Sequence, residues 1–218
     1  MIYPLFFFAL LLGLVPIAIL LTRKNLTSEA RLLKPFIWLI MVASFYEFFI
    51  TYMLQVAAAV WFAVYGILEF ACIYYLFHKL LKGKYNVFLY FFAVLFAFAN
   101  ILLQFRIIAL TNLQKEAYLV AIATLFTLIG TVIWFKELFS SLEVPSLTKS
   151  PVFYFITGLV IYFSGTLFLF LVAEHFMKND DLNLGFYWNL ITVFNIILRI
   201  LISIGIWKGH QKSVQYSG

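Results

Sequence analysis

The sequence predicts an all-α polytopic membrane protein, a bundle of seven transmembrane helices. Hydrophobic residues make up 65% of the 218-residue chain and charged residues 11%, whereas soluble domains have about 45–50% and about 25%. Seven stretches are apolar and long enough for a helix of about 20 residues to cross the hydrocarbon core. They are 3–21, 35–52, 58–78, 85–103, 117–135, 151–173 and 185–207. Backbone groups in lipid must be satisfied within the segment, so each stretch is expected to be helical.

Prolines and loops indicate how these helices begin and connect. Pro16 lies inside the first stretch and leaves the carbonyl of Leu12 without its helical donor, which predicts a kink there. Pro35 and Pro151 stand at helix starts, where a proline loses no hydrogen bond. The second and third stretches are joined by few polar residues, so they are expected to form a tight antiparallel hairpin. Because no loop is long enough for a soluble domain, residues 1–218 are expected to form one transmembrane domain.

The basic residues predict the orientation of the bundle. Cytoplasmic loops of membrane proteins carry an excess of Lys and Arg. The loops after helices 1, 3 and 5 and the tail hold Arg23, Lys24, Arg31, Lys34, Lys79, Lys82, Lys84, Lys136, Lys149, Lys208 and Lys212. The opposite loops hold Arg106, Lys115 and Lys178. We therefore expect the N-terminus outside and the C-terminus in the cytoplasm of a multi-pass cell-membrane protein, of the bacterial inner-membrane kind.

Polar residues inside the stretches gather at one depth. At a rise of ~1.5 Å per residue from the basic end, Glu47, Glu69, Asn195 and Arg199 lie between ~14 and ~20 Å deep. Ionisable groups at such depth are costly and face the bundle interior. The sequence therefore predicts a polar pocket between helices 2, 3 and 7. Its candidate ligand-binding residues, selected by shared depth and helical spacing, are Glu47, Tyr65, Glu69, Trp188, Thr192, Asn195 and Arg199.

Charge balance within this pocket leaves two readings open. Glu69 and Arg199 share a depth and are expected to contact each other directly or through one water, as a structural ion pair. Glu47 would then be the surplus carboxylate, available to water or a ligand cation. Trp61, Tyr65, Tyr187 and Trp188 either line the outer part of a ligand pocket or form an interfacial aromatic belt.

The chain offers no set of residues that indicates catalysis, and we expect no enzyme. His78, His175 and His210 are too far apart to hold one metal ion. Cys72 is the only cysteine, which excludes an internal disulfide and indicates a small buried side chain. The seventh stretch has no lysine, which excludes the Schiff base of a retinal protein. We expect no cofactor, no metal and no nucleic-acid partner.

Two short motifs carry a family resemblance. The stretch from Tyr65 to Phe70 has the form YxxxEF, and Asn195 to Arg199 has the form NxxxR. Together they resemble a family of bacterial seven-helix integral membrane proteins to which no activity is assigned. The resemblance implies the seven-helix plan and adds nothing about mechanism.

Two functions agree with these observations. The first is binding or transport of a small apolar or zwitterionic solute or lipid in the interior pocket. A weak similarity between helices 1–3 and 5–7, a 3+1+3 repeat, favours it because transporter sites lie between repeats. The second is a seven-helix sensor or interaction protein that signals through a separate partner chain. Membrane lipids surround the protein in both.

Overall fold

Seven long helices make up most of the protein. The computed structural model describes residues 3–22, 26–56, 59–104, 110–140, 147–178 and 184–215. The helices long and apolar enough to cross a membrane are seven within these ranges, and no strand occurs there. They are α1 (Tyr3–Thr22), α3 (Lys34–Tyr46) with its continuation η1 (Glu47–Met53), α4 (Ala59–Leu80), α5 (Asn86–Gln104), α6 (Asn112–Ser140), α7 (Pro151–Lys178) and α8 (Leu184–Gln215). The predicted all-helical, seven-span plan is confirmed.

The helix boundaries differ from the prediction where polar residues extend a helix. The helix expected over 117–135 spans 29 residues as α6, and the one expected over 185–207 spans 32 residues as α8. Apolar length marks only the part of a helix that fits the hydrocarbon core. The polar ends therefore continue the helices without contributing to the apolar run. In α1 the helix continues through Pro16.

Two short elements were not expected from the sequence. The helix α2 (Ser28–Arg31) lies between α1 and α3, and its N-cap residue Thr27 accepts a hydrogen bond from the backbone N–H of Ala30 at 3.3 Å. The 3₁₀ turn η2 (Leu147–Lys149) precedes α7. A capping oxygen of this kind satisfies one of the backbone donors that a helix leaves free at its start.

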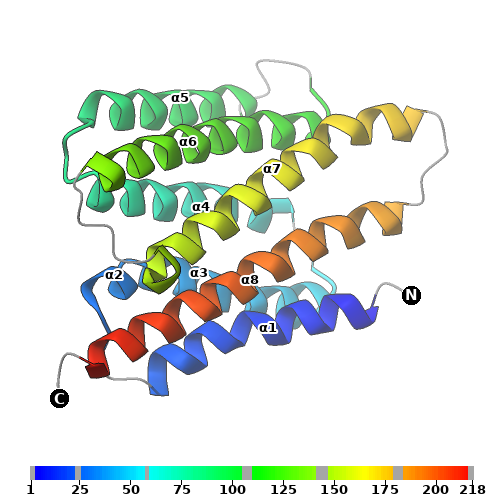
Figure 1. The fold of residues 1–218 in the computed structure, drawn as a ribbon. Coiled ribbons are helices and arrows are strands. Elements are labelled where there is room, and N and C mark those ends of the chain that lie inside the picture. Colours follow the sequence, from blue (N-terminus) through cyan, green and yellow to red (C-terminus); the bar gives the residue numbers. More distant parts are fainter. Residues whose placement is uncertain are drawn as a thin grey trace.

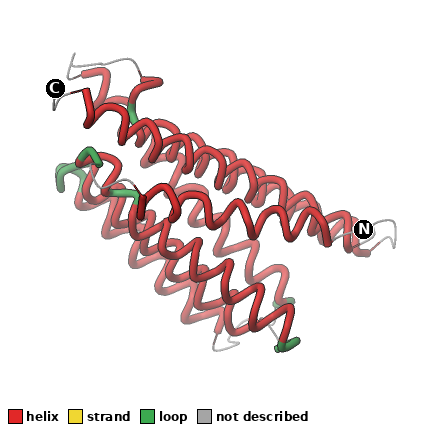
Figure 2. Tube along the Cα trace, turned by 90° about the horizontal axis from the view of Figure 1, so that it is seen from below, coloured by secondary structure: helices red, strands yellow, loops and turns green. Residues whose placement is uncertain are grey.

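Each long helix packs against the next along the chain, and the last closes on the first. Contacts join α1 to α3, α3 to α4, α4 to α5, α5 to α6, α6 to α7, α7 to α8 and α8 to α1, and α4 also touches α6. Figure 1 shows α7 running diagonally between the α5–α6 pair and the α8–α1 pair. In the view from below, the helices again run alongside one another over most of their length (Figure 2). The start of α1 and the end of α8 lie at opposite ends of the bundle (Figure 1).

Glycines allow α7 and α8 to approach closely. A Cβ at Gly158 would lie 3.0 Å from Leu198 Cδ1, and one at Gly205 would lie 2.8 Å from the backbone oxygen of Pro151. Helix contacts in membranes are enriched in such small residues, because lipid supplies no hydrophobic force to drive helices together. Close packing of the backbones therefore holds this pair.

The core is rich in closely packed phenylalanine rings, and large apolar side chains also cover the outside. Phe126 of α6 is fully buried, and its ring lies 5.2 Å from that of Phe70 and 5.4 Å from that of Phe92. On the outer surface, Val60 is 75% and Val87 85% exposed. Such an apolar exterior is suited to lipid rather than water.

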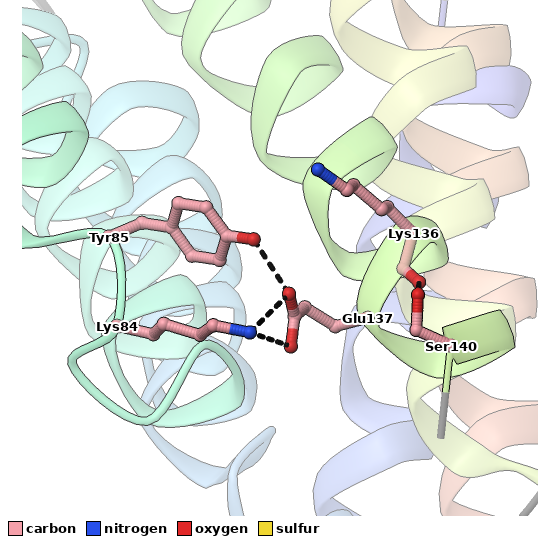
Figure 3. A network of polar contacts seen from close by, with 5 residues as sticks. All are labelled: Lys84, Tyr85, Lys136, Glu137 and Ser140. Carbon is pink, nitrogen blue, oxygen red and sulfur yellow. Dashed lines mark hydrogen bonds and ion pairs between the residues drawn. The ribbon is translucent and has the colours of Figure 1, made fainter. Parts of the chain in front are cut away.

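The end of the bundle where α8 ends is fastened at two places. At the first, α2 packs against Gly209 of α8, and the Thr27 backbone N–H donates to the Gly209 carbonyl at 3.4 Å. At the second, Lys84 Nζ pairs with the Glu137 carboxylate at 2.9 Å, and the Tyr85 hydroxyl donates to it at 2.6 Å (Figure 3). Because Lys84 and Tyr85 precede α5 whereas Glu137 belongs to α6, this cluster joins two helix ends.

Candidate functional site

Glu69 occupies the middle of α4 and is surrounded by phenol hydroxyls. Its side chain is only 7% exposed. The Tyr65 hydroxyl, one turn earlier on the same helix, donates to Glu69 Oε1 at 3.2 Å. The phenol of Tyr162, from α7, also interacts with the Glu69 carboxyl. The carboxyl therefore faces two neutral groups from two helices.

Arg199 connects α8 to α1. Its side chain is 4% exposed, and Nη1 donates a hydrogen bond to the carbonyl of Ala9. Gly13, one turn further along α1, makes this approach possible. A Cβ there would lie 2.9 Å from Arg199 Nη1 and would clash with the hydroxyl of Ser44 from α3. The guanidinium thus lies where α1, α3 and α8 meet, and Gly13 leaves room for it because it has no side chain.

Neither Glu47 nor Glu69 forms an ion pair with Arg199 in the described part of the chain, which corrects the direct contact expected for Glu69. Among the described residues no ion pair joins Arg199 to Glu69, so the expected direct contact is absent. Arg199 instead interacts electrostatically with Glu47, and Glu69 has no comparable interaction with it. Equal depth on α4 and α8 did not imply contact because α7 and α1, rather than α4, are the neighbours of α8. The surplus carboxyl is therefore Glu69.

Glu47 begins the π-helical segment η1. A π-helix widens the backbone by one residue per turn and is frequent at functional sites. Here the Leu54 backbone N–H donates to the carbonyl of Phe49, five residues earlier, at 3.1 Å. The widened turn follows directly after Glu47, which is half-buried. The sequence carried no signal for it, because π and α segments share the same apolar pattern.

A row of aromatic rings leads from the η1 end of the bundle to Glu69. The ring of Tyr46 stacks on Trp61 at a centroid distance of 4.2 Å, and Trp61 lies 6.1 Å from the ring of Tyr65. Tyr65 in turn donates to Glu69. This contact between α3 and α4 supports the expected hairpin. Trp61 and Tyr65 thus contact other side chains of the bundle, in addition to any role at the membrane interface.

Three buried polar atoms near these residues have no hydrogen-bond partner within the described part of the chain. They are Arg199 Nε, Ser44 Oγ and Thr51 Oγ1. Buried polar groups are usually satisfied by protein or by ordered water, and each exception calls for an explanation. Arg199 and Ser44 stand at the same meeting point of α1, α3 and α8. The interior is thus polar beyond what its own hydrogen bonds satisfy.

The remaining predicted ligand-binding residues are less closely tied to this cluster. Asn195 and Thr192 are half-buried on α8. No hydrogen bond joins Asn195 to another described residue, whereas Thr192 interacts with its surroundings. The side chains of Tyr187 and Trp188 lie outside the described residues. Ligand binding by all seven predicted residues stays a prediction.

Two participants escaped the sequence analysis, and a signal existed for each. Tyr162 lies eleven residues after Pro151, or ~16 Å deep, close to the depth of Glu69. Glu116 precedes the helix predicted over 117–135, but α6 begins before it, and its carboxyl acts electrostatically on Glu69. It also continues the helical stripe of Thr124, Thr127 and Thr131. Those threonines bond the carbonyl four residues earlier at 2.7–2.8 Å, the ordinary behaviour of Thr in a helix.

The cluster contains one guanidinium, carboxyl groups and phenols, and the described residues hold no group of three His, Cys, Asp or Glu side chains suited to a metal ion. Cys72 is free, half-buried and packed against the core. Such an arrangement can hold charge, donate hydrogen bonds and accept a proton.

Comparisons with family models, with curated proteins and with solved structures find no match to this chain.

Proposed function

We propose that the chain is a membrane protein that binds or transports a small apolar or zwitterionic solute or lipid between α3, α4 and α8. The surplus carboxyl of Glu69 is the observation that carries the proposal. Glu47, Glu69 and Arg199 lie inside the bundle, and the electrostatic interaction of Arg199 is with Glu47 rather than Glu69. A group of this kind within a membrane helix marks a functional site by default.

The unpartnered polar atoms support a ligand with polar groups of its own. Arg199 Nε and Ser44 Oγ are buried donors without a partner in the described ranges. A zwitterionic solute supplies an acceptor for these donors and a positive group for the carboxyls. The aromatic row of Tyr46, Trp61 and Tyr65 suits the apolar part of such a molecule.

The expected orientation, with the N-terminus outside and the C-terminus in the cytoplasm, belongs to this proposal. At the α2 end of the bundle, topology gathers the loops and tail that hold most of the basic residues, which supports a cytoplasmic location for that end. The 3+1+3 repeat and the location in a bacterial inner membrane stay predictions.

Native mass spectrometry of the protein extracted in mild detergent tests the proposal. We expect a small molecule or lipid to remain bound to the wild-type chain. Glu69→Gln removes a charged partner worth about 1.5–3 kcal/mol. We therefore expect this variant to bind the molecule at least roughly ten-fold more weakly and to show a smaller bound fraction. Glu137→Gln is the matched control, because it makes the same change outside the cluster.

Retention of the same bound fraction in Glu69→Gln, with both variants folded, would contradict the proposal. In that case the sensor that signals through a partner chain becomes the better reading, since it requires no interior ligand.

A further inference from the structure

The interior charges do not balance if every ionisable group is charged. Glu47 and Glu69 would contribute two negative charges and Arg199 one positive charge. An uncompensated charge in the membrane interior costs several kcal/mol. Because Glu69 is only 7% exposed and forms no ion pair with a described residue, neutrality of the interior requires that this carboxyl carry a proton.

The groups that face Glu69 from α4, α6 and α7 include no cation. On α4 they are Tyr65 and Cys72, on α7 Tyr162, and on α6 the carboxyl of Glu116. The Tyr65 hydroxyl donates a hydrogen bond to Glu69 at 3.2 Å and Tyr162 interacts with the same carboxyl, whereas Glu116 adds repulsion to an ionised Glu69. None of these residues offers Glu69 a positive charge.

The other helices packed against α4, and α8 beyond them, complete this survey. From η1, the continuation of α3, Glu47 acts on Tyr65 and Tyr162, and from α8, Arg199 acts on the same two tyrosines. From α5, the titratable side chain within the described span is Tyr90, which is 63% exposed on the outer surface. Arg199 forms no ion pair with Glu69 in the described part of the chain.

We propose that Glu69 is a proton-binding site whose proton is exchanged for the positive group of a bound solute. This inference rests on the proposed function and specifies its ligand class, a cation-bearing solute. In the empty protein the Glu69 carboxyl donates its O–H to one tyrosine oxygen and accepts from the other hydroxyl. When a cationic group enters, the proton leaves to water, and both tyrosines donate to the carboxylate. One positive charge replaces another, so the interior stays neutral in both states.

Tyr65 and Tyr162 suit this exchange because a phenol hydroxyl both donates and accepts a hydrogen bond. They come from α4 and α7, so a change in the hydrogen bonds of Glu69 alters a contact between two helices. A lysine or arginine in their place would fix the carboxylate in its charged form.

Infrared spectroscopy of the detergent-solubilised protein without added solute locates the proton. A protonated carboxylic acid has a carbonyl stretch that a carboxylate lacks. We expect this band from the wild-type protein at neutral pH, its loss in Glu69→Gln, and its retention in the matched variant Glu137→Gln, which makes the same change outside the interior. Tyr162→Phe, which keeps the acid and removes one hydrogen bond, should shift the band without abolishing it. A wild-type protein without the band, or a band kept in Glu69→Gln, would overturn the assignment.

Proton release tests the exchange itself. Tetraphenylphosphonium, an apolar cation, is added to the lightly buffered protein while the pH is recorded. We expect about one proton released for each probe bound by wild-type protein, and release reduced at least ten-fold in Glu69→Gln. Binding without release would overturn the exchange, as would the absence of any release from the wild-type protein. The infrared band needs no ligand, so a failure of the proposed solute site and a failure of the proton site give different results.

Discussion

The close approach of α7 and α8 at Gly205 gives the sharpest test of how this bundle is held together. An added Cβ at Gly205 would lie 2.8 Å from the carbonyl oxygen of Pro151, which is closer than such atoms ordinarily come. The oxygen belongs to the backbone of the first turn of α7 and cannot rotate away. Gly205→Ala therefore requires the start of α7 to shift against α8.

A matched glycine in α4 isolates this steric cost. A Cβ at Gly66 would meet no atom within 4 Å. Both substitutions gain the same helix propensity, about 1 kcal/mol. The difference in unfolding free energy between Gly205→Ala and Gly66→Ala is therefore the overpacking cost, about 1–3 kcal/mol. Taking about 2 kcal/mol, we expect Gly205→Ala to melt roughly 4–8 °C below Gly66→Ala for a chain of this size.

The only cysteine of the chain provides the assay. Cys72 is half-buried on α4 and packed against the core, so a thiol-reactive fluorescent dye reports its exposure as the protein unfolds in detergent. Both glycine variants keep this cysteine, which makes their melting curves directly comparable. Equal melting temperatures for the two variants would refute the conclusion that α7 and α8 are in backbone contact at Gly205.

Two further predictions concern the end of the bundle where α8 ends. Hydrogen bonds and charge from Glu137 raise the pKa of Lys84 and that of Tyr85 above their ordinary values of 10.5 and 10.0, so their contribution to stability is fully present at neutral pH and is lost as the pH rises through these raised values. The melting-temperature difference between wild-type protein and Glu137→Gln should therefore shrink at alkaline pH, and a constant difference up to strongly alkaline pH would exclude the ion pair. A reporter fused after Gly218 should be active in the cytoplasm, whereas activity outside would reverse the proposed orientation.

The interior cluster illustrates how far depth along a helix can predict contact. Depth correctly selected Glu47, Glu69 and Arg199 as buried or half-buried residues. It could not select the partner of Arg199, because helices at one depth are neighbours only if the packing order puts them side by side. Tyr162 lies at the same depth, but tyrosine is common in apolar spans, so its type did not mark it as a site residue.

The sequence by itself determined the class of the protein and the positions of its seven spans. Each depends on local quantities, namely apolar length and the cost of leaving backbone groups unpaired in lipid. Only the tertiary structure decided which helices touch. The hydrogen bond from Arg199 to Ala9, the two tyrosines around Glu69 and the π-helical turn after Glu47 depend on helix order and rotation. Those follow from the fit of side chains, such as Gly13 against Ser44, which no single stretch of sequence contains.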